Sequence, residues 1–255
     1  MNNTDQFVFV AVRLKSRRLP LKALEDIEGM PLLLRLTERI AERFPRERIV
    51  LCTSINSEDD LIEQLAAEHG INCYRGDELD VMGRFIEAAA VYKAATIARV
   101  TGDNPLTDPD MLVHMFKCHT EEGAEYTYTD DLPVGTRAEI IDVASLRRIH
   151  GQLSDPTYSE YMTYMLKRPD KLKVLEVKIQ DHLLKRPELS LTVDTLADIT
   201  LVREIYKHFG EILPSLQSII EWLDSKPELR ITLGESPIAL PDEINCSFRE
   251  DSSHS

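Results

Sequence analysis

A cluster of basic side chains follows the first apolar run of the chain, FVFVAV at residues 7–12. Guanidinium groups offer a planar fork of donors that suits phosphate oxygens, and an ammonium group offers a compact positive charge. We therefore predict that this segment binds a triphosphate, with Ser16 adding a hydroxyl and Pro20 stiffening the backbone. On composition alone, a solvated basic turn is an equal alternative. The basic residues are Arg13, Lys15, Arg17, Arg18 and Lys22, and we expect Arg13, Ser16, Arg18 and Lys22 to contact the phosphates.

Two aspartates follow later apolar runs at positions where they could hold a metal ion. Asp103 ends RVTGD, and Asp194 ends LTVD. Mg²⁺ takes oxygen ligands, often one or two carboxylates together with phosphate oxygens and water. If both runs are strands of one parallel sheet, their carboxylates converge at the ligand-binding edge of that sheet. The alternatives are structural, because Asp103 could cap the turn before Pro105 and Asp194 could cap a helix that begins at residue 196.

The alternation of apolar runs and helical periodicity predicts the fold that would position these groups. Strand and helix patterns follow one another at intervals of about 25 residues, which is typical of a mainly parallel sheet with helices on both faces. We therefore expect an α/β protein with a Rossmann-like sheet, whose ligands bind at the carboxyl ends of the strands. The expected strands are 7–12, 48–54, 71–76, 96–103 and 124–129, and the expected helices are 31–44, 58–70, 80–93 and 108–123.

The regular alternation stops near residue 130. One domain is expected over 1–235, with a smaller lobe at about 130–185 and a loose tail at 236–255. The further elements expected are strands at 135–143 and 189–195, a helix and then a strand within 156–179, and helices at 196–210 and 212–230.

The overall composition excludes several classes of protein. The chain of 255 residues has 30 Lys and Arg against 44 Asp and Glu, a net charge of −14, which argues against binding of nucleic acid or of an anionic membrane. The sequence shows no signal-peptide pattern and no apolar stretch long enough for a membrane span, so we expect a cytoplasmic protein. Neither GxxxxGK[ST] nor GxGxxG is present, and the cysteines and histidines lack zinc-ligand spacing.

Taken in order, the motifs resemble those of the cytidylyltransferase family. VRLKSRRLPLKAL and EDIEGMPLL match the family's opening, and the likeness continues through YRGDELDVMGRFIEAA, RVTGDNPLTDP and LTVDTLADITLVREIY. It covers about residues 7–210 and is nearest to the spore coat polysaccharide biosynthesis protein F group. The resemblance implies a nucleotide-diphospho-sugar transferase fold with an acceptor and dimerisation lobe at about 130–185. Relatives often have glycine at the positions of Lys15 and Leu21, and a loop without glycine adopts positive φ less readily.

The resemblance also implies roles for residues in later motifs. It places RGDELDVMGRF near the nucleotide, which makes Arg75, Asp80 and Arg84 candidates for contact with the base. Asp80 could instead cap a helix and pair with Arg84 four residues later. Thr53 and Ser54, at the end of the second strand, could hydrogen-bond the ribose or the base. The candidates for the acceptor side are Tyr128, Gly135, Thr136, Glu139 and Glu160.

The implied reaction is the transfer of CMP from CTP to an acidic sugar or related acceptor, with release of pyrophosphate, for cell-surface glycan biosynthesis. Arg13 and Lys22 would stabilise the departing pyrophosphate, and Asp103 with Asp194 would hold Mg²⁺. A phosphate or phosphonate acceptor is the alternative within the family, and a homodimer is expected. Two alternatives come from other classes: a non-catalytic nucleotide-binding module, and a GT-A glycosyltransferase, whose DxD element DPD (108–110) matches formally.

Overall fold

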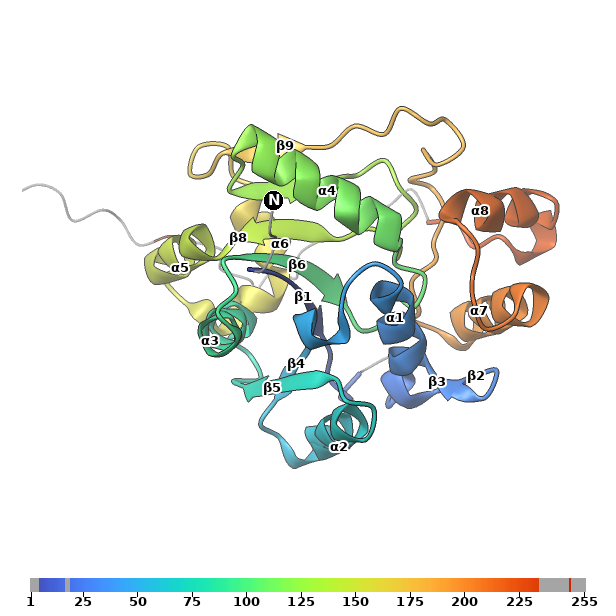
Figure 1. Ribbon diagram of the computed structural model, residues 1–255, viewed down its shortest axis with the longest axis horizontal. Helices are drawn as coiled ribbons and strands as arrows, with labels where there is room; N and C mark the ends of the chain where they lie inside the picture. Colours follow the sequence, from blue (N-terminus) through green and yellow to red (C-terminus); the bar gives the residue numbers. More distant parts are fainter. Residues whose placement is uncertain (1–4, 17–18, 234–247, 249–255) are drawn as a thin grey trace, which may run out of the picture.

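A mainly parallel sheet of seven strands forms the centre of the structure, a computed structural model that describes residues 5–16, 19–233 and 248 (Figure 1). The strands are β1 (Gln6–Ala11), β4 (Ile49–Ser54), β5 (Asn72–Gly76), β6 (Thr96–Thr101), β7 (Tyr126–Tyr128), β8 (Glu139–Asp142) and β9 (Val174–Glu176). Their spatial order is β5-β4-β1-β6-β8-β7-β9. The first four strands of this order run parallel, and β8 pairs antiparallel with both β6 and β7. The predicted α/β fold class is therefore confirmed.

Helices cover both faces of the sheet. They are α1 (Leu32–Ala41), α2 (Asp60–Glu68), α3 (Val81–Tyr92), α4 (Pro109–Glu122), α5 (Val143–Gln152), α6 (Met162–Leu166), α7 (Leu196–Phe209) and α8 (Leu216–Asp224). Val8 and Val10 of β1 pack with α1, α2 and α4, whereas Phe7 and Phe9 pack with α3, α5 and α6. Because successive residues of a strand point to opposite faces, a strand buried on both sides must be apolar throughout, as the run 7–12 is.

Two 3₁₀ turns and a short hairpin connect these layers and bear on the site. The 3₁₀ turn η1 (Lys22–Leu24) follows the basic segment, and a second one, η4 (Pro156–Tyr161), precedes α6. A two-stranded hairpin, β2 (Asp26–Ile27) with β3 (Met30–Pro31), leads into α1. This hairpin lies beside α7 at one end of the molecule, where α7 and α8 form a layer of their own (Figure 1).

The predicted strand at 189–195 does not form, although its backbone is described throughout. The segment forms only isolated β-bridges, such as the one between Val134 and Ser190. The apolar side chains of this segment, Leu191 and Val193 among them, pack on α7 and α8 instead of joining the sheet. The prediction was wrong because alternating apolar residues fit any extended segment whose one side is buried.

Other boundaries differ less from the sequence-based expectations. The strand expected at 96–103 ends at Thr101, so that Asp103 stands in the loop after it. The tail at 236–255 lies outside the described residues except for Phe248, which bridges to Leu153 and lies 4.3 Å from the Lys171 ammonium, measured to its ring centroid. Among the described helices, none has the length and apolar character that crossing a bilayer requires.

A buried histidine beneath the sheet gives the fold a predictable acid sensitivity. His119 of α4 is 4 % exposed, and its Nδ1 lies 2.8 Å from Thr127 Oγ1. Burial lowers the pKa of His119 from 6.5 to about 4, only partly offset by Asp142. The neutral form is thus favoured in the folded state. The stability that neutral His119 contributes is therefore fully present above pH 6.5, and it is lost as the pH falls through 6.5 towards 4.

We expect this histidine to account for up to about 3 kcal/mol of the stability lost between pH 7 and pH 4. Urea unfolding of the wild type and of His119→Gln, measured at several pH values in this window, checks it. The difference between the two unfolding free energies should shrink or reverse as the pH falls. A difference that does not change with pH would show that His119 does not carry this sensitivity.

Candidate active site

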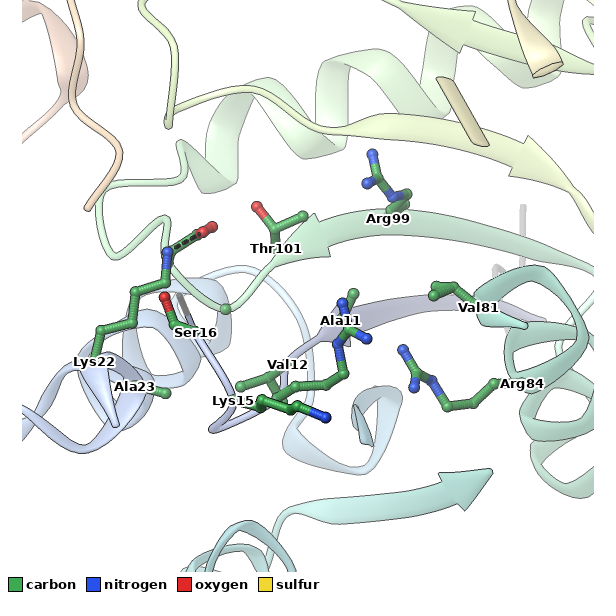
Figure 2. A pocket seen from close by; sticks show the side chains of 13 residues that line it. Ala11, Val12, Lys15, Ser16, Lys22, Ala23, Val81, Arg84, Arg99 and Thr101 are labelled. Carbon is green, nitrogen blue, oxygen red and sulfur yellow. Dashed lines mark hydrogen bonds and ion pairs between the residues drawn. The ribbon is translucent and has the colours of Figure 1, made fainter. Parts of the chain in front are cut away.

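A cleft at the carboxyl end of β1 and β6 collects most of the predicted phosphate ligands. Its walls come from the basic loop (residues 12–22), the start of α3 and the end of β6 (Figure 2). We call it the cationic cleft, because its charged lining residues are Arg13, Lys15, Lys22, Arg84 and Arg99 against the single carboxylate of Asp103. Ser16 also lines it, as predicted, whereas Arg17 and Arg18 lie outside the described residues. A field of this sign at one sheet edge suits a polyanion.

The basic loop is held in place by two carboxylates. The Arg13 guanidinium donates to the backbone oxygen of Glu78 at 3.1 Å, and the Lys15 ammonium lies 3.3 Å from the Glu78 carboxylate. A hydrogen bond from Asn56, together with the charge of Lys15, holds the pKa of Glu78 below its ordinary value. Asp59 accepts the Leu14 N–H at 2.8 Å. The contacts of Glu78 and Asp59 with the loop were not predicted, because neither residue type nor spacing indicates such contacts.

The backbone is strained at Leu21, within the described part of the loop. Leu21 has φ 60° and ψ 14°, the left-handed region, although the absence of glycine made positive φ less expected. A non-glycine residue in this region costs about 1–2 kcal/mol. The Leu21 N–H donates to Leu14 O at 3.1 Å, which closes the loop and starts η1 at Lys22. Leu21 is directly followed by Lys22, whose side chain contacts the two predicted metal ligands.

Lys22 joins the two aspartates that were predicted to bind metal. Its Nζ lies 2.7 Å from Asp103 Oδ2, 3.0 Å from Asp194 Oδ1 and 2.9 Å from the backbone oxygen of Val193. Burial alone would lower the pKa of Lys22, but the two carboxylates outweigh it, and the pKa is raised above 10.5. The ammonium is therefore fully charged at neutral pH.

Asp194 reaches this position through a backbone contact and not through the sheet. The Val193 N–H donates to Asp103 O at 2.9 Å, which fixes the segment 189–195 against the loop after β6. Capping of α7, the alternative for Asp194, is done by Thr195 and Asp198, whose side chains form a reciprocal capping box. Sequence analysis thus predicted correctly that the two aspartates meet, but for the wrong reason in the case of Asp194.

Arg84 is the charged residue of the RGDELDVMGRF motif that lines the cationic cleft, next to Val81 of the same motif. Its side chain is buried, and Nη1 donates to the Asp77 backbone oxygen at 3.0 Å. Burial lowers its pKa, and among the described residues its Nε has no hydrogen-bond partner. An orphaned donor on a buried guanidinium indicates a ligand that would complete its hydrogen bonding. The alternative reading, in which Arg84 pairs with Asp80, does not hold, because this guanidinium contacts the Asp77 backbone oxygen.

Four other residues predicted to contact the nucleotide lie outside the lining of the cationic cleft. Arg75 lies on the outer side of β5, where its guanidinium contacts the Asp60 carboxylate at 2.6 Å and the Glu63 carboxylate at 2.8 Å. The Ser54 hydroxyl donates to Asp59, and Thr53 is fully buried within β4. Asp80, the fourth, caps α3. None of these four residues lines the cationic cleft as the structure describes it, so contact with a nucleotide there would need their rearrangement.

Asp80 fastens the start of α3 to the neighbouring lobe. Its carboxylate accepts the Gly83 N–H at 2.8 Å as the N-cap, the Ser159 hydroxyl at 3.0 Å and a contact from His150 Nε2 at 2.7 Å. The Met82 N–H in turn donates to Ser159 at 3.0 Å. Asp80 therefore positions the helix that carries Arg84, a role compatible with the capping alternative in the sequence.

We expect Asp80→Ala to lower the free energy of unfolding by about 2 kcal/mol, because the N-cap and two part-buried hydrogen bonds are lost together. Urea unfolding measures this loss. In a double-mutant cycle, Ser159→Ala should cost much less in the Asp80→Ala background than alone. Unchanged stability accompanied by weaker CTP binding would instead indicate that Asp80 contacts the base.

A second cleft adjoins the first and contains most of the predicted acceptor residues. Tyr128, Gly135 and Glu139 line it, and it shares Arg99, Thr101 and Asp103 with the cationic cleft. We call it the acceptor cleft. The predicted Thr136 is buried beside it and donates to Pro133 O, whereas Glu160 lies in η4 with a side chain outside the described residues. Because the two clefts meet at Asp103, a group in one can reach a group in the other.

Glu139 forms the centre of a buried network in the wall of the acceptor cleft. Its carboxylate accepts hydrogen bonds from Arg99 at 2.7 Å, from the Tyr126 hydroxyl at 2.7 Å and from the Thr163 hydroxyl at 2.5 Å. Burial alone would raise its pKa, but Arg99 and the two hydroxyls hold the pKa below its ordinary value. Arg99 was missed, although an arginine in the middle of an otherwise apolar strand signals a buried polar site.

Gly135 has a conformation and a position that no other residue could take. Its φ is +94°, and a Cβ atom there would lie 2.3 Å from the Thr192 nitrogen. The close approach joins the turn at 133–136 to the segment 189–195, with Leu191 N–H donating to Val134 O at 2.7 Å. Gly135 therefore shapes the floor of the acceptor cleft with its backbone.

The two carboxylates of Asp103 and Asp194 fit a divalent metal ion. A cationic group already lies between them, and their oxygens are the hard ligands that Mg²⁺ takes. In the part of the chain that the structure describes, no cluster of three or more acidic, histidine or cysteine ligands occurs, so phosphate and water would have to complete the coordination. The DPD element is not such a site, because Asp108 caps α4 by accepting the N–H groups of Asp110 and Met111.

The chain resembles several known proteins in sequence and in fold. The spore coat polysaccharide biosynthesis protein SpsF of Bacillus subtilis is 29% identical over 212 residues, which cover 81% of this chain and 88% of that protein. The structure of a cytidylyltransferase from Leptospira borgpetersenii superimposes with a TM-score of 0.81 at 24% identity, over 88% of this chain and 96% of the other. A CMP:2-keto-3-deoxy-manno-octonic acid synthetase complexed with CTP gives 0.60 at 16% identity, over 80% and 98%.

A family model provides the assignment. The model described as Cytidylyltransferase matches residues 7–208, which include the basic loop, both aspartates and, except for Leu233, the lining of both clefts. This range nearly coincides with the range of the sequence resemblance. The chain is a member of the cytidylyltransferase family of nucleotidyltransferases.

Proposed function

We propose that this protein transfers CMP from CTP to a hydroxyl group of an acidic sugar or related acceptor and releases pyrophosphate. The observation that carries the proposal is the junction of two clefts at Asp103, one lined by cations and the other largely by carboxylates and hydroxyls. The solved relative complexed with CTP supports the choice of nucleotide, and the name of the Bacillus relative supports a role in polysaccharide biosynthesis.

In this reaction an acceptor oxygen attacks the α-phosphorus of CTP. A new P–O bond forms, the bond from the α-phosphorus to the bridging oxygen breaks, and the acceptor hydroxyl loses its proton to solvent. The protein mainly orients the reactants and neutralises charge. Arg13 and Lys22 would contact the β- and γ-phosphates and stabilise pyrophosphate as it leaves, and Arg84 would satisfy its free Nε donor on the nucleotide.

Mg²⁺ is the cofactor of this proposal, held by Asp103 and Asp194. When bound, it supplies Lewis-acid polarisation of the phosphate and lowers the pKa of an acceptor hydroxyl. The residues of the chain supply the rest: the cationic cleft holds the triphosphate, and the acceptor cleft holds the second substrate next to Asp103. Arg99 belongs to both clefts, so it would keep Glu139 ordered while facing the reacting groups.

The charges of the acceptor cleft favour a sugar acid over a phosphorylated acceptor. Its cations, Arg99 and Arg137, each already contact a carboxylate, Glu139 at 2.7 Å and Asp130 at 3.4 Å. A dianionic phosphate would add two charges beside carboxylates, whereas a single sugar carboxylate could share Arg137 with Asp130. The sugar hydroxyls could then donate to the remaining carboxylates. The acidic residues that line this cleft are Asp103, Asp130, Glu139, Asp194 and Asp198.

A matrix of nucleotides and acceptors tests the proposal. Each of the four common nucleoside triphosphates is combined with ulosonic acids, with phosphate or phosphonate acceptors and with no acceptor, and pyrophosphate release is measured. We expect release from CTP with an ulosonic acid. Release only with phosphorylated acceptors would establish the alternative, and CTP binding without any release would indicate a binding module. Transfer of sugar from a nucleotide sugar would indicate a glycosyltransferase.

The assembly and location of the enzyme are also part of the proposal. We propose a homodimer in the cytoplasm that associates through the lobe at 130–185, which exposes large apolar side chains such as Tyr164 and Leu183. The remaining part of residues 1–235 would then form the nucleotide-binding body. Sedimentation velocity of the wild type should give a dimer, and replacement of Tyr164 by aspartate should shift it to the monomer. A monomeric wild type at all accessible concentrations would disprove the dimer.

A further inference from the structure

We propose that Lys22 takes the place of the divalent cation in the nucleotide-free enzyme, so that a metal ion enters the Asp103–Asp194 pair only together with CTP. The inference rests on the proposed function, because it concerns the same pair of carboxylates. It adds an order of binding and a second role for Lys22: the side chain would leave the aspartates and turn towards the phosphates when the nucleotide arrives.

The contacts of the ammonium group are those of a metal ion. An ammonium has three donors, and three oxygens surround Lys22 Nζ, those of Asp103 at 2.7 Å, Val193 at 2.9 Å and Asp194 at 3.0 Å. The Lys22 side chain is 13 % exposed. A hard cation would use the same carboxylate oxygens, so the ammonium and the metal cannot occupy this position together.

The surrounding charges determine where the displaced ammonium can go. Lys22 also lines the cationic cleft together with four other cations, Arg13, Lys15, Arg84 and Arg99. Glu78 and Glu139 offset part of this charge, but they do not line the cleft. In the empty cleft the four cations repel a further positive charge, which keeps Lys22 on the aspartates. A bound triphosphate reverses the sign of the field in the cleft. Displacement of Lys22 by a metal ion is therefore unfavourable when the cleft is empty and favourable when CTP is bound.

The exchange requires only rotation of one side chain. Lysine carries its charge on a flexible four-carbon stem. Lys22 begins η1, and its side chain both contacts the two aspartates and lines the cationic cleft (Figure 2). Its backbone is fixed by the strained Leu21 and by the Glu25 N–H, which donates to Lys22 O at 3.2 Å. The loop can thus stay in place while the ammonium moves between carboxylates and phosphates.

Binding of Mn²⁺ in the absence of nucleotide tests this exchange. Electron paramagnetic resonance of free Mn²⁺ gives the affinity for the wild type, for Lys22→Met and for Lys15→Met. Lys22→Met should bind Mn²⁺ at least about tenfold more tightly than the wild type, because no ammonium competes. Lys15→Met removes the same charge from the same cleft without touching the aspartates, so its affinity should stay near that of the wild type. Adding Asp103→Asn to Lys22→Met should abolish the gain.

Equal Mn²⁺ affinities of the wild type and Lys22→Met would overturn the inference. So would an equal gain in Lys15→Met, which would indicate only a long-range effect of charge. Should Lys22→Met fail to fold, the wild type alone still decides: CTP must tighten its Mn²⁺ binding beyond the affinity of free CTP for Mn²⁺. Pyrophosphate release by the wild type is measured separately, so that loss of the proposed function and loss of the exchange give different results.

Discussion

Asp103→Asn is expected to lower the turnover of CTP by about a thousandfold or more. A metal ion held by Asp103 would stabilise the charge on the leaving pyrophosphate, and this stabilisation lowers the activation barrier by several kcal/mol. Asp103 stands where the cationic cleft and the acceptor cleft meet, and its carboxylate contacts Lys22 at 2.7 Å. Asparagine keeps the size and one oxygen but removes the charge that would bind a metal ion. The measurement is pyrophosphate release with the acceptor that the matrix identifies.

The fold should survive this substitution. Lys22 retains Asp194 and the Val193 oxygen as partners, so no buried charge is left alone. The matched control is Asp110→Asn, which changes an exposed aspartate seven positions later that pairs with Arg43 at the surface. We expect the control to keep wild-type turnover and both variants to keep the wild-type circular dichroism spectrum. Comparable turnover of Asp103→Asn and the wild type would remove Asp103 from the mechanism.

Arg13→Met is expected to lower kcat/KM for CTP by about a hundredfold, the usual consequence of removing one preorganised charged donor from a transition state. Arg13 is the first charged residue of the basic loop; it lines the cationic cleft, and its side chain is only 24% exposed. Methionine keeps much of the apolar stem. Steady-state kinetics with varied CTP at fixed acceptor give the value.

Lys15→Met provides the comparison within the same loop. Both Arg13 and Lys15 contact Glu78, but the Lys15 side chain is 66% exposed. Solvent and salt screen such a charge, so we expect a loss of less than about fivefold. Similar losses for both variants would mean that the loop acts through its total charge and that Arg13 makes no specific contact.

The sequence predicted the sheet well because its central strands are buried on both faces. The run at 7–12 must be apolar throughout to contact α1 and α4 on one side and α3 and α5 on the other. The position of Asp103 could be predicted for the same reason, because the strand before it is recognisable and parallel strands end at the ligand-binding edge of the sheet. The basic loop follows the same logic after β1.

The parts of the site that were missed depend on contacts between distant segments. Glu78 and Asp59 hold the basic loop, yet Glu78 lies 65 positions after Arg13 and Asp59 lies 45 positions after Leu14. Arg75 was predicted to contact the base because of its motif, but Asp60 and Glu63 on α2 attract its guanidinium away from the cleft. Such a choice of partner depends on the packing of α2 against β5, which residue spacing does not express.

Asp194 illustrates both the success and its limit. Its alternation of apolar neighbours predicted an extended segment, which is correct, and a strand of the sheet, which is not. The residue reaches Asp103 because the Val193 N–H finds an acceptor on the loop after β6. Only the three-dimensional structure supplies this contact, whereas the resemblance supplied the role.

A crystal structure of the wild type with CTP and Mn²⁺ tests most directly whether the basic loop and the two aspartates form one nucleotide site. We expect the triphosphate to lie against Arg13, Ser16 and Lys22, and an anomalous manganese peak to lie between Asp103 and Asp194. Lys22 Nζ should then have moved from the aspartates to a phosphate oxygen. A triphosphate bound elsewhere, or manganese remote from both aspartates, would contradict the account.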